Sequence, residues 1–252
     1  MTRPAPLLVR HSGPSRLVTV TAGRLLTALL DAIAARGVAH VALTGGTMGS
    51  AVVAGLAEHP AADAVDWSLV HVWWGDERFL PAGDPERNDT QNDEAGLREL
   101  THGSDRVHRV PGPDEVDSAE ESARQYAETL RAEGGGAFDV VLLGVGPDGH
   151  VASLFPGHPA QATTGAITVA VHDSPKPPPT RVSLTAECLS RSRELWFVVA
   201  GADKAGAVAT GVAGTPAAES STGLVRGAER TLWLVDEAAA SEVAGARPGI
   251  SG

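Results

Sequence analysis

Short apolar runs rich in β-branched and aromatic residues recur along the chain, and several of them are continuous rather than alternating. Continuous runs are typical of strands buried on both faces, as in a parallel sheet covered by helices on each side. The predicted strands are residues 6–10, 40–43, 67–74, 138–143, 166–171, 194–200 and 231–236. The predicted fold class is therefore α/β, with a mostly parallel sheet flanked by helices.

Helical patterns lie between these runs. Apolar residues recur at helical spacing in residues 25–33, before Gly37, and residues 48–59 also have a helical pattern. Residues 117–133 form a further predicted helix, opened by a capping box of Ser118 and Glu121.

The length and charge limit what the molecule can be. A chain of 252 residues without an internal repeat fits one α/β domain, 1–252, with its core in about residues 7–240. The net charge of −11 argues against a nucleic acid or an anionic membrane as partner, but allows a small anionic substrate held by a few cations. No apolar run approaches 18 residues and no signal pattern begins the chain, so we expect a soluble, cytoplasmic protein.

Neither cysteines nor histidines indicate a metal site. Cys188 is the single cysteine, which excludes an internal disulfide and a cysteine-rich zinc site, and we expect it to be a buried small residue. The histidines are scattered and show no tight ligand spacing, so no metal is predicted.

The stretch FDVVLLGVGPDGHVASLFPG, residues 138–157, allows two interpretations. Gly144, Gly146 and Gly149 have the spacing of a dinucleotide fingerprint, but prolines and Gly157 interrupt the helix that such a site needs. The other interpretation makes Asp148 and His150 an acid–base pair at the end of a strand. A plainer alternative is that Asp148 caps a short helix at 151–155 and His150 simply packs.

Polar clusters at other strand ends favour a site. Gly45, Gly46 and Thr47 lie between a strand and a helix, where backbone N–H groups and the helix dipole favour an anion. Asp76 and Arg78 follow the strand at 67–74, although such charges are often only a solvated rim. Ligands of α/β sheets bind outside the carboxyl ends of the strands, so these clusters are expected to meet.

Two cations complete the candidate site. A proline-rich loop, 173–179, precedes Arg181, which is predicted to lie at the start of a strand. Lys204 is predicted at the start of a helix, where a cation is unfavourable unless an anion binds beside it.

The segments LTGGT, GDERFLP with Asn88 downstream, DGHVASLFP, SPKPPPTR and AGADKA together resemble the 6-phosphogluconolactonase family, over about residues 7–240. The resemblance implies a NagB/RpiA-like fold, no cofactor, and hydrolysis of 6-phosphoglucono-1,5-lactone to 6-phosphogluconate in the pentose phosphate pathway. The chain departs from the usual family pattern at Met48, Gly49 and Arg87.

The resemblance and the residue chemistry together assign roles. His150 is the expected general base that activates water, since its ordinary pKa is about 6.5. Asp148 orients either substrate hydroxyls or His150, and Asp76 binds hydroxyls. The expected substrate-binding residues are Gly45, Gly46, Thr47, Arg78, Asn88, Arg181 and Lys204.

Two alternatives remain open. One is an amino-sugar phosphate deaminase or isomerase on the same scaffold, although Phe155 stands where the deaminase pattern has an acidic residue. The other is a non-catalytic sugar-phosphate sensor, which would need only the anion site. As partners we expect a small sugar-phosphate lactone, no nucleic acid and no membrane, with the chain a monomer or weak homodimer.

Overall fold

A computed structural model describes residues 3–134, 137–214, 216 and 218–243. Six parallel strands form the main sheet in the order β1-β9-β8-β5-β2-β3. Their bounds are Leu7–His11 for β1, Ala39–Leu43 for β2, Val70–Trp74 for β3, Val140–Leu143 for β5, Glu194–Val199 for β8 and Arg230–Asp236 for β9. The prediction of a mostly parallel sheet is confirmed. The strand expected at 67–74 is shorter, because residues 67–69 form a 3₁₀ turn capped by Asp66.

The helices are α1 (Pro14–Arg36), α2 (Gly46–Ala57), α3 (Asn88–Glu94), α4 (Leu97–Thr101), α5 (Ala119–Ala132), α6 (Ala186–Leu189) and α7 (Ala205–Ala213). Ser118 caps α5 as predicted, since its side chain accepts a hydrogen bond from the backbone N–H of Glu121.

A second, antiparallel sheet has the order β4-β7-β6, with β4 at Asp76–Arg78, β6 at Thr168–Val171 and β7 at Arg181–Leu184. The run at 166–171 is thus a strand, but it belongs to this small sheet. The charged segment 76–78, expected to follow a strand, is itself a strand. Asp76 pairs with Ser183 and Arg78 with Arg181. The second sheet therefore brings two of the predicted site segments together.

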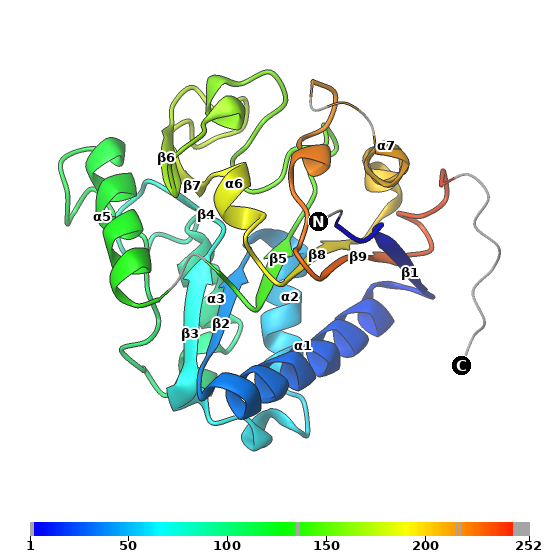
Figure 1. The fold of residues 1–252 in the computed structure, drawn as a ribbon, viewed down its shortest axis with the longest axis horizontal. Coiled ribbons are helices and arrows are strands. Elements are labelled where there is room, and N and C mark those ends of the chain that lie inside the picture. The colour runs from blue at the N-terminus through cyan, green and yellow to red at the C-terminus, as the bar shows by residue number, and fades with distance from the viewer. Residues whose placement is uncertain (1–2, 135–136, 215, 217, 244–252) are drawn as a thin grey trace.

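The main sheet is covered on both faces (Figure 1). Alternate residues of each strand enter two separate apolar clusters: Val41 and Leu43 of β2 lie in one, and Ala42 lies in the other. Helices α1 and α2 cover one face, whereas α5, α6 and the small sheet cover the other. Burial on both faces explains why the sequences of these strands are continuous apolar runs.

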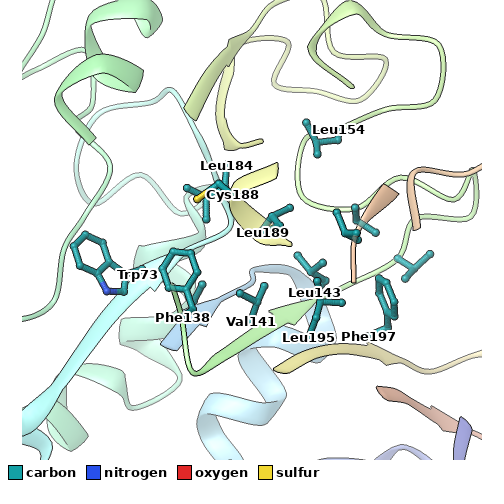
Figure 2. Close-up of a cluster of buried hydrophobic side chains, with 14 of the residues drawn as sticks. Trp73, Phe138, Val141, Leu143, Leu154, Leu184, Cys188, Leu189, Leu195 and Phe197 are labelled. Carbon is teal, nitrogen blue, oxygen red and sulfur yellow. The ribbon is translucent and has the colours of Figure 1, made fainter. Parts of the chain in front are cut away.

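Figure 2 shows part of the cluster beneath α6. Val141, Leu143 and Leu195 of the main sheet face Cys188 and Leu189 of α6. Cys188 is buried as expected, and burial raises the pKa of its thiol to about 11. A neutral thiol in an apolar cluster is a packing residue and not a nucleophile.

Helix α1 is 23 residues long and, by length and composition alone, apolar enough to cross a membrane. The criterion of an unbroken apolar run overlooked it, because threonines and Arg24 interrupt its sequence. Leu17, Leu25 and Leu29 of this helix are fully buried, and the helix packs against α2, β1, β2 and β9. Packing within the fold accounts for these three leucines, whereas Leu30 of the same helix is exposed.

Candidate active site

A cleft of about 680 Å³ lies at the carboxyl ends of β2, β5 and β8, beside β4. Nine of the ten predicted site residues line it: Gly45, Gly46, Thr47, Asp76, Arg78, Asn88, His150, Arg181 and Lys204. The tenth, Asp148, contacts His150 from outside the lining residues. The fold thus gathers segments that lie far apart in the sequence into one cleft.

A tight turn after β5 presents the acid–base pair. Gly146 N–H donates to the carbonyl of His150, and Gly149, at a φ of 77°, donates back to Gly146. A Cβ atom on Gly146 would lie 2.0 Å from Nδ1 of His150 and 2.4 Å from Oδ1 of Asp148. Gly146 is therefore a glycine because two functional side chains fold back against its backbone.

The dinucleotide interpretation of this turn is wrong on structural grounds, and so is the helix at 151–155 that Asp148 would cap. Residues 151–155 form a short bridged turn between Val151 and Leu154, so Asp148 caps no helix there. The next helical element is a 3₁₀ turn at Pro159–Ala162, so no crossover helix follows the glycines as a dinucleotide site requires.

His150 is held by Asp148 on one side of its ring. Its Nδ1 lies 2.6 Å from Oδ1 of Asp148, and Nζ of Lys176 lies 3.3 Å from the same oxygen and 3.4 Å from Nδ1. An ionised carboxylate can only accept hydrogen bonds, so Nδ1 carries the proton and Nε2 is left as the basic nitrogen. This is the tautomer that a general base needs.

The environment keeps His150 neutral near pH 7. Burial lowers the pKa of His150 below its ordinary value, the carboxylate of Asp148 opposes this, and the ammonium of Lys176 lowers it further. Burial acts to raise the pKa of Asp148, but the hydrogen bond and charge of His150, with Lys176, outweigh burial and leave this pKa below its ordinary value. The pair is thus a neutral imidazole beside an ionised carboxylate.

The ring of Phe155 packs against the ring of His150. The centroids of Phe155 and His150 are 4.5 Å apart, and the guanidinium of Arg181 lies 5.7 Å from the centre of the Phe155 ring. Phe155 is fully buried. It forms an apolar support for His150 and offers no proton to the site.

Asp76 is fixed at the base of the cleft. Its carboxylate accepts a 2.6 Å hydrogen bond from Oγ of Ser153, and Nη1 of Arg181 lies 3.9 Å away. Asn88 Nδ2 donates to the backbone carbonyl of Asp76 at 2.7 Å. Its own Oδ1 is buried, has no hydrogen-bond partner among the described residues, and lies against Gly45. Asn88 therefore places an acceptor beside the glycine loop that lines the cleft.

The charges of residues 76–78 are not a solvated rim. Glu77 is buried and its carboxylate accepts from the backbone N–H groups of Arg78, Asn88 and Asp89. It closes the amino end of α3. Burial and the charge of Asp89 raise the pKa of Glu77 to about 8, so hydrogen bonds and not a fixed negative charge hold it there near neutral pH. Glu77 thus holds Asn88 next to Asp76.

Arg87, a departure from the usual family pattern, has a structural position. It is buried and makes two hydrogen bonds of 2.9 Å to the carboxylate of Asp89. It also donates to the carbonyls of Leu80 and Val110. These four bonds tie the segment before α3 to the rest of the fold.

Arg181 fixes the proline-rich loop. Its Nε donates to the carbonyl of Pro178, and its Nη2 donates to those of Lys176 and Pro177. Only Nη1, facing Asp76, is directed away from this loop. By holding the loop, Arg181 holds Lys176 beside His150.

The part of the cleft at the amino ends of α2 and α7 is suited to an anion. Gly45 is the N-cap of α2, and Gly46 has a φ of 73°. Within the described part of the chain no side chain caps this helix, and its first turn has no acidic residue, so its N–H groups are open to a negative ligand. Lys204, the N-cap of α7, and Arg78 line the same cleft. Among described residues, the nearest acidic partner of Lys204 is Asp203, at 3.5 Å.

Sequence reasoning missed two residues of this site. Lys176 lies in the proline-rich motif SPKPPPTR, and its position between two rigid prolines is the one signal in the sequence that points to it. Ser153, three residues after His150, has no local signal, because its partner Asp76 is 77 residues away.

Comparisons with known proteins agree with this geometry. The family model described as glucosamine-6-phosphate isomerases/6-phosphogluconolactonase matches residues 12–233. The chain is 47% identical to the 6-phosphogluconolactonase of Streptomyces coelicolor, over 94% of this chain and 95% of that protein. It is 42% identical to the 6-phosphogluconolactonase of Mycobacterium tuberculosis, over 90% of this chain and 94% of that one.

Among solved structures, 6-phosphogluconolactonase from Trypanosoma brucei superposes with a TM-score of 0.81 at 25% identity, covering 96% of this chain and 100% of its own. The match of fold, length and sequence spans the whole set of cleft-lining segments. This chain therefore belongs to the glucosamine-6-phosphate isomerase/6-phosphogluconolactonase family.

Proposed function

We propose that this protein is a 6-phosphogluconolactonase, which hydrolyses 6-phosphoglucono-1,5-lactone to 6-phosphogluconate. The observation that carries the proposal is His150, whose Nδ1 is occupied by Asp148 while its Nε2 is free to accept a proton within an anion-binding cleft. The names of the similar bacterial proteins support the same reaction.

In the proposed mechanism Nε2 of His150 removes a proton from a water molecule as its oxygen attacks the lactone carbonyl carbon. The tetrahedral intermediate carries its negative charge on the former carbonyl oxygen, and the ammonium of Lys176, which lines the cleft 3.4 Å from Nδ1 of His150, would stabilise that charge. Collapse of the intermediate breaks the bond to the ring oxygen, which takes the proton back from His150. One water is consumed and one carboxylic acid is formed.

The remaining residues bind and orient the substrate. Asp76 and Asn88 are placed to bind sugar hydroxyls, since one offers a carboxylate and the other an amide oxygen that has no partner among the described residues. Lys204, Arg78 and the N–H groups of Gly46 and Thr47 would hold the 6-phosphate. Arg181 acts mainly through the loop that it fixes, with Nη1 as its remaining donor.

A deaminase or isomerase function is less well supported, because Phe155 contacts His150 where an acidic partner would be needed. A sensor would need neither Asp148 nor the neutral His150. We further infer one domain over 1–252, a cytoplasmic protein, and a monomer or weak homodimer that needs no cofactor.

The decisive experiment measures lactone disappearance, corrected for spontaneous hydrolysis, together with ammonia release from glucosamine 6-phosphate. We expect rapid acid production from the lactone and no ammonia. Ammonia release at a rate comparable to lactone turnover would instead assign the deaminase reaction, and inactivity toward both compounds with tight 6-phosphogluconate binding would assign the sensor.

A further inference from the structure

Three histidines meet at the end of the main sheet opposite the cleft. His40 and His71 lie near the amino ends of β2 and β3, and His108 comes from the segment between α4 and α5. The rings of His40 and His71 are 4.5 Å apart and those of His71 and His108 are 5.1 Å apart, while Trp73 stacks on His108 at 3.8 Å. From His40 to the cleft at Thr44 the strand spans roughly 13 Å.

Two of these histidines face an acidic side chain. Nδ1 of His71 and Nε2 of His108 are 2.9 Å apart. One ring nitrogen of each histidine and a carboxylate oxygen of Glu133 all lie within 4.8 Å of one another. Among the described residues no other such trio of possible metal ligands occurs. We propose that His71, His108 and Glu133 form a binding site for a divalent transition-metal ion, with Zn²⁺ as the best match.

The donor set favours zinc. Two imidazole nitrogens and one carboxylate oxygen are common zinc ligands, with bond lengths of about 2.0–2.2 Å. At a tetrahedral angle the two nitrogens would lie about 3.4 Å apart, so the rings need to separate by only about half an ångström. A fourth position would be left for water.

The contact between the two histidines has to open before a metal ion can enter. One of the two facing nitrogens carries the hydrogen of the 2.9 Å hydrogen bond, so that ring has to move its proton to its other nitrogen before both facing nitrogens can coordinate an ion. The charges of Glu133 and Asp105 favour a cation here, and that of Arg106 opposes it.

Neighbouring contacts set the position of the site. Trp73 Nε1 donates to Nδ1 of His40 at 3.2 Å, which holds both rings in the stack. An ion bound here would connect His71 of β3, His108 of the segment before α5, and Glu133, which caps the carboxyl end of α5. Its role would be to stabilise the fold, since it lies far from the cleft.

The test is titration of the purified full-length protein with Zn²⁺ by calorimetry, and with Co²⁺ as an absorbing substitute. We expect one ion per chain at this site and a Tm that rises with Zn²⁺ concentration. His108→Ala and Glu133→Gln should each weaken binding at least about 10- to 100-fold and remove the rise in Tm. Glu133 is exposed, so its variant should fold normally.

Matched controls locate the ion. His102→Asn and Glu99→Gln change an exposed histidine and an exposed glutamate elsewhere and should leave binding unchanged. His150→Asn should also leave it unchanged. Zn²⁺ binding that survives His108→Ala and Glu133→Gln, or that is lost in His150→Asn, would overturn the proposal, as would the absence of binding by the parent protein.

Discussion

Nδ1 of His150 lies 2.6 Å from Oδ1 of Asp148, and this contact fixes which nitrogen of the ring can act as a base. The turn that makes the contact possible depends on Gly146, whose missing side chain leaves space for both groups. Lys176, 3.3 Å from the same carboxylate oxygen, adds a cation beside the pair. The three groups can be tested separately.

Removal of the base should abolish most of the catalysis. We expect His150→Ala to lower kcat by about 10²–10⁴-fold, because general-base catalysis contributes rate factors of this size. Circular dichroism and Tm should show an intact fold. His102→Asn serves as a control at an exposed histidine. A kcat within about threefold of the parent would mean that His150 only packs.

The pH dependence of the parent should follow the same imidazole. The pKa of His150 lies below the ordinary value of 6.5, so the ring is neutral and active above that pH. The rate should be constant near neutral pH and fall on the acid side as the ring is protonated. A pH–rate profile of kcat/KM measures this directly. A rate independent of pH throughout the histidine range would contradict the assignment.

Asp148 and Lys176 should move this acid limb in opposite directions. Asp148 raises the pKa of His150, so Asp148→Asn should shift the limb to lower pH. Lys176 lowers the same pKa, so Lys176→Met should shift it to higher pH. Both variants should also lose rate. Asp148→Asn no longer fixes the tautomer of His150, and Lys176→Met removes the cation that stabilises the oxyanion of the intermediate. Shifts in the same direction would show that one of these contacts does not form in solution.

Lys204 should discriminate between phosphorylated and plain ligands. Loss of one partner of a charge pair costs roughly 2–5 kcal/mol, and the 25% exposure of this side chain points to the lower end. Lys204→Ala should therefore raise the Kd of 6-phosphogluconate about 30-fold while changing that of gluconate little. Calorimetric titration with both ligands makes the comparison. Equal losses would mean that Lys204 does not contact the phosphate.

Glu77 should stabilise the fold and hold the cleft together. Its carboxyl oxygens accept hydrogen bonds from three backbone N–H groups, so Glu77→Ala leaves two buried donors and one part-buried donor without this partner. At roughly 1 kcal/mol or more for each, the free energy of unfolding should fall by about 3 kcal/mol. Chemical denaturation measures the loss, with Glu99→Ala as the exposed control. A loss no greater than that of the control would show that water replaces this carboxylate.

Local sequence determined a large part of this protein. The continuous apolar runs specified the strands of the main sheet, because a strand covered by helices on both faces needs apolar residues at every position. Glycines and prolines after residue 143 specified a turn in place of a helix. The glycines at the start of α2 and the charges after β3 indicated the cleft, because parallel strands end at one edge.

The tertiary structure alone decided the rest, for reasons of distance along the chain. Segment 76–78 became a strand only by pairing with β7, about a hundred residues later. Lys176 reached His150 because Arg181 binds the loop carbonyls, and no local pattern encodes that contact. His71 and His108 are 37 residues apart, so no short sequence spacing indicated that their side chains meet. Long-range pairing depends on packing of the whole chain, and residue order along one segment does not contain it.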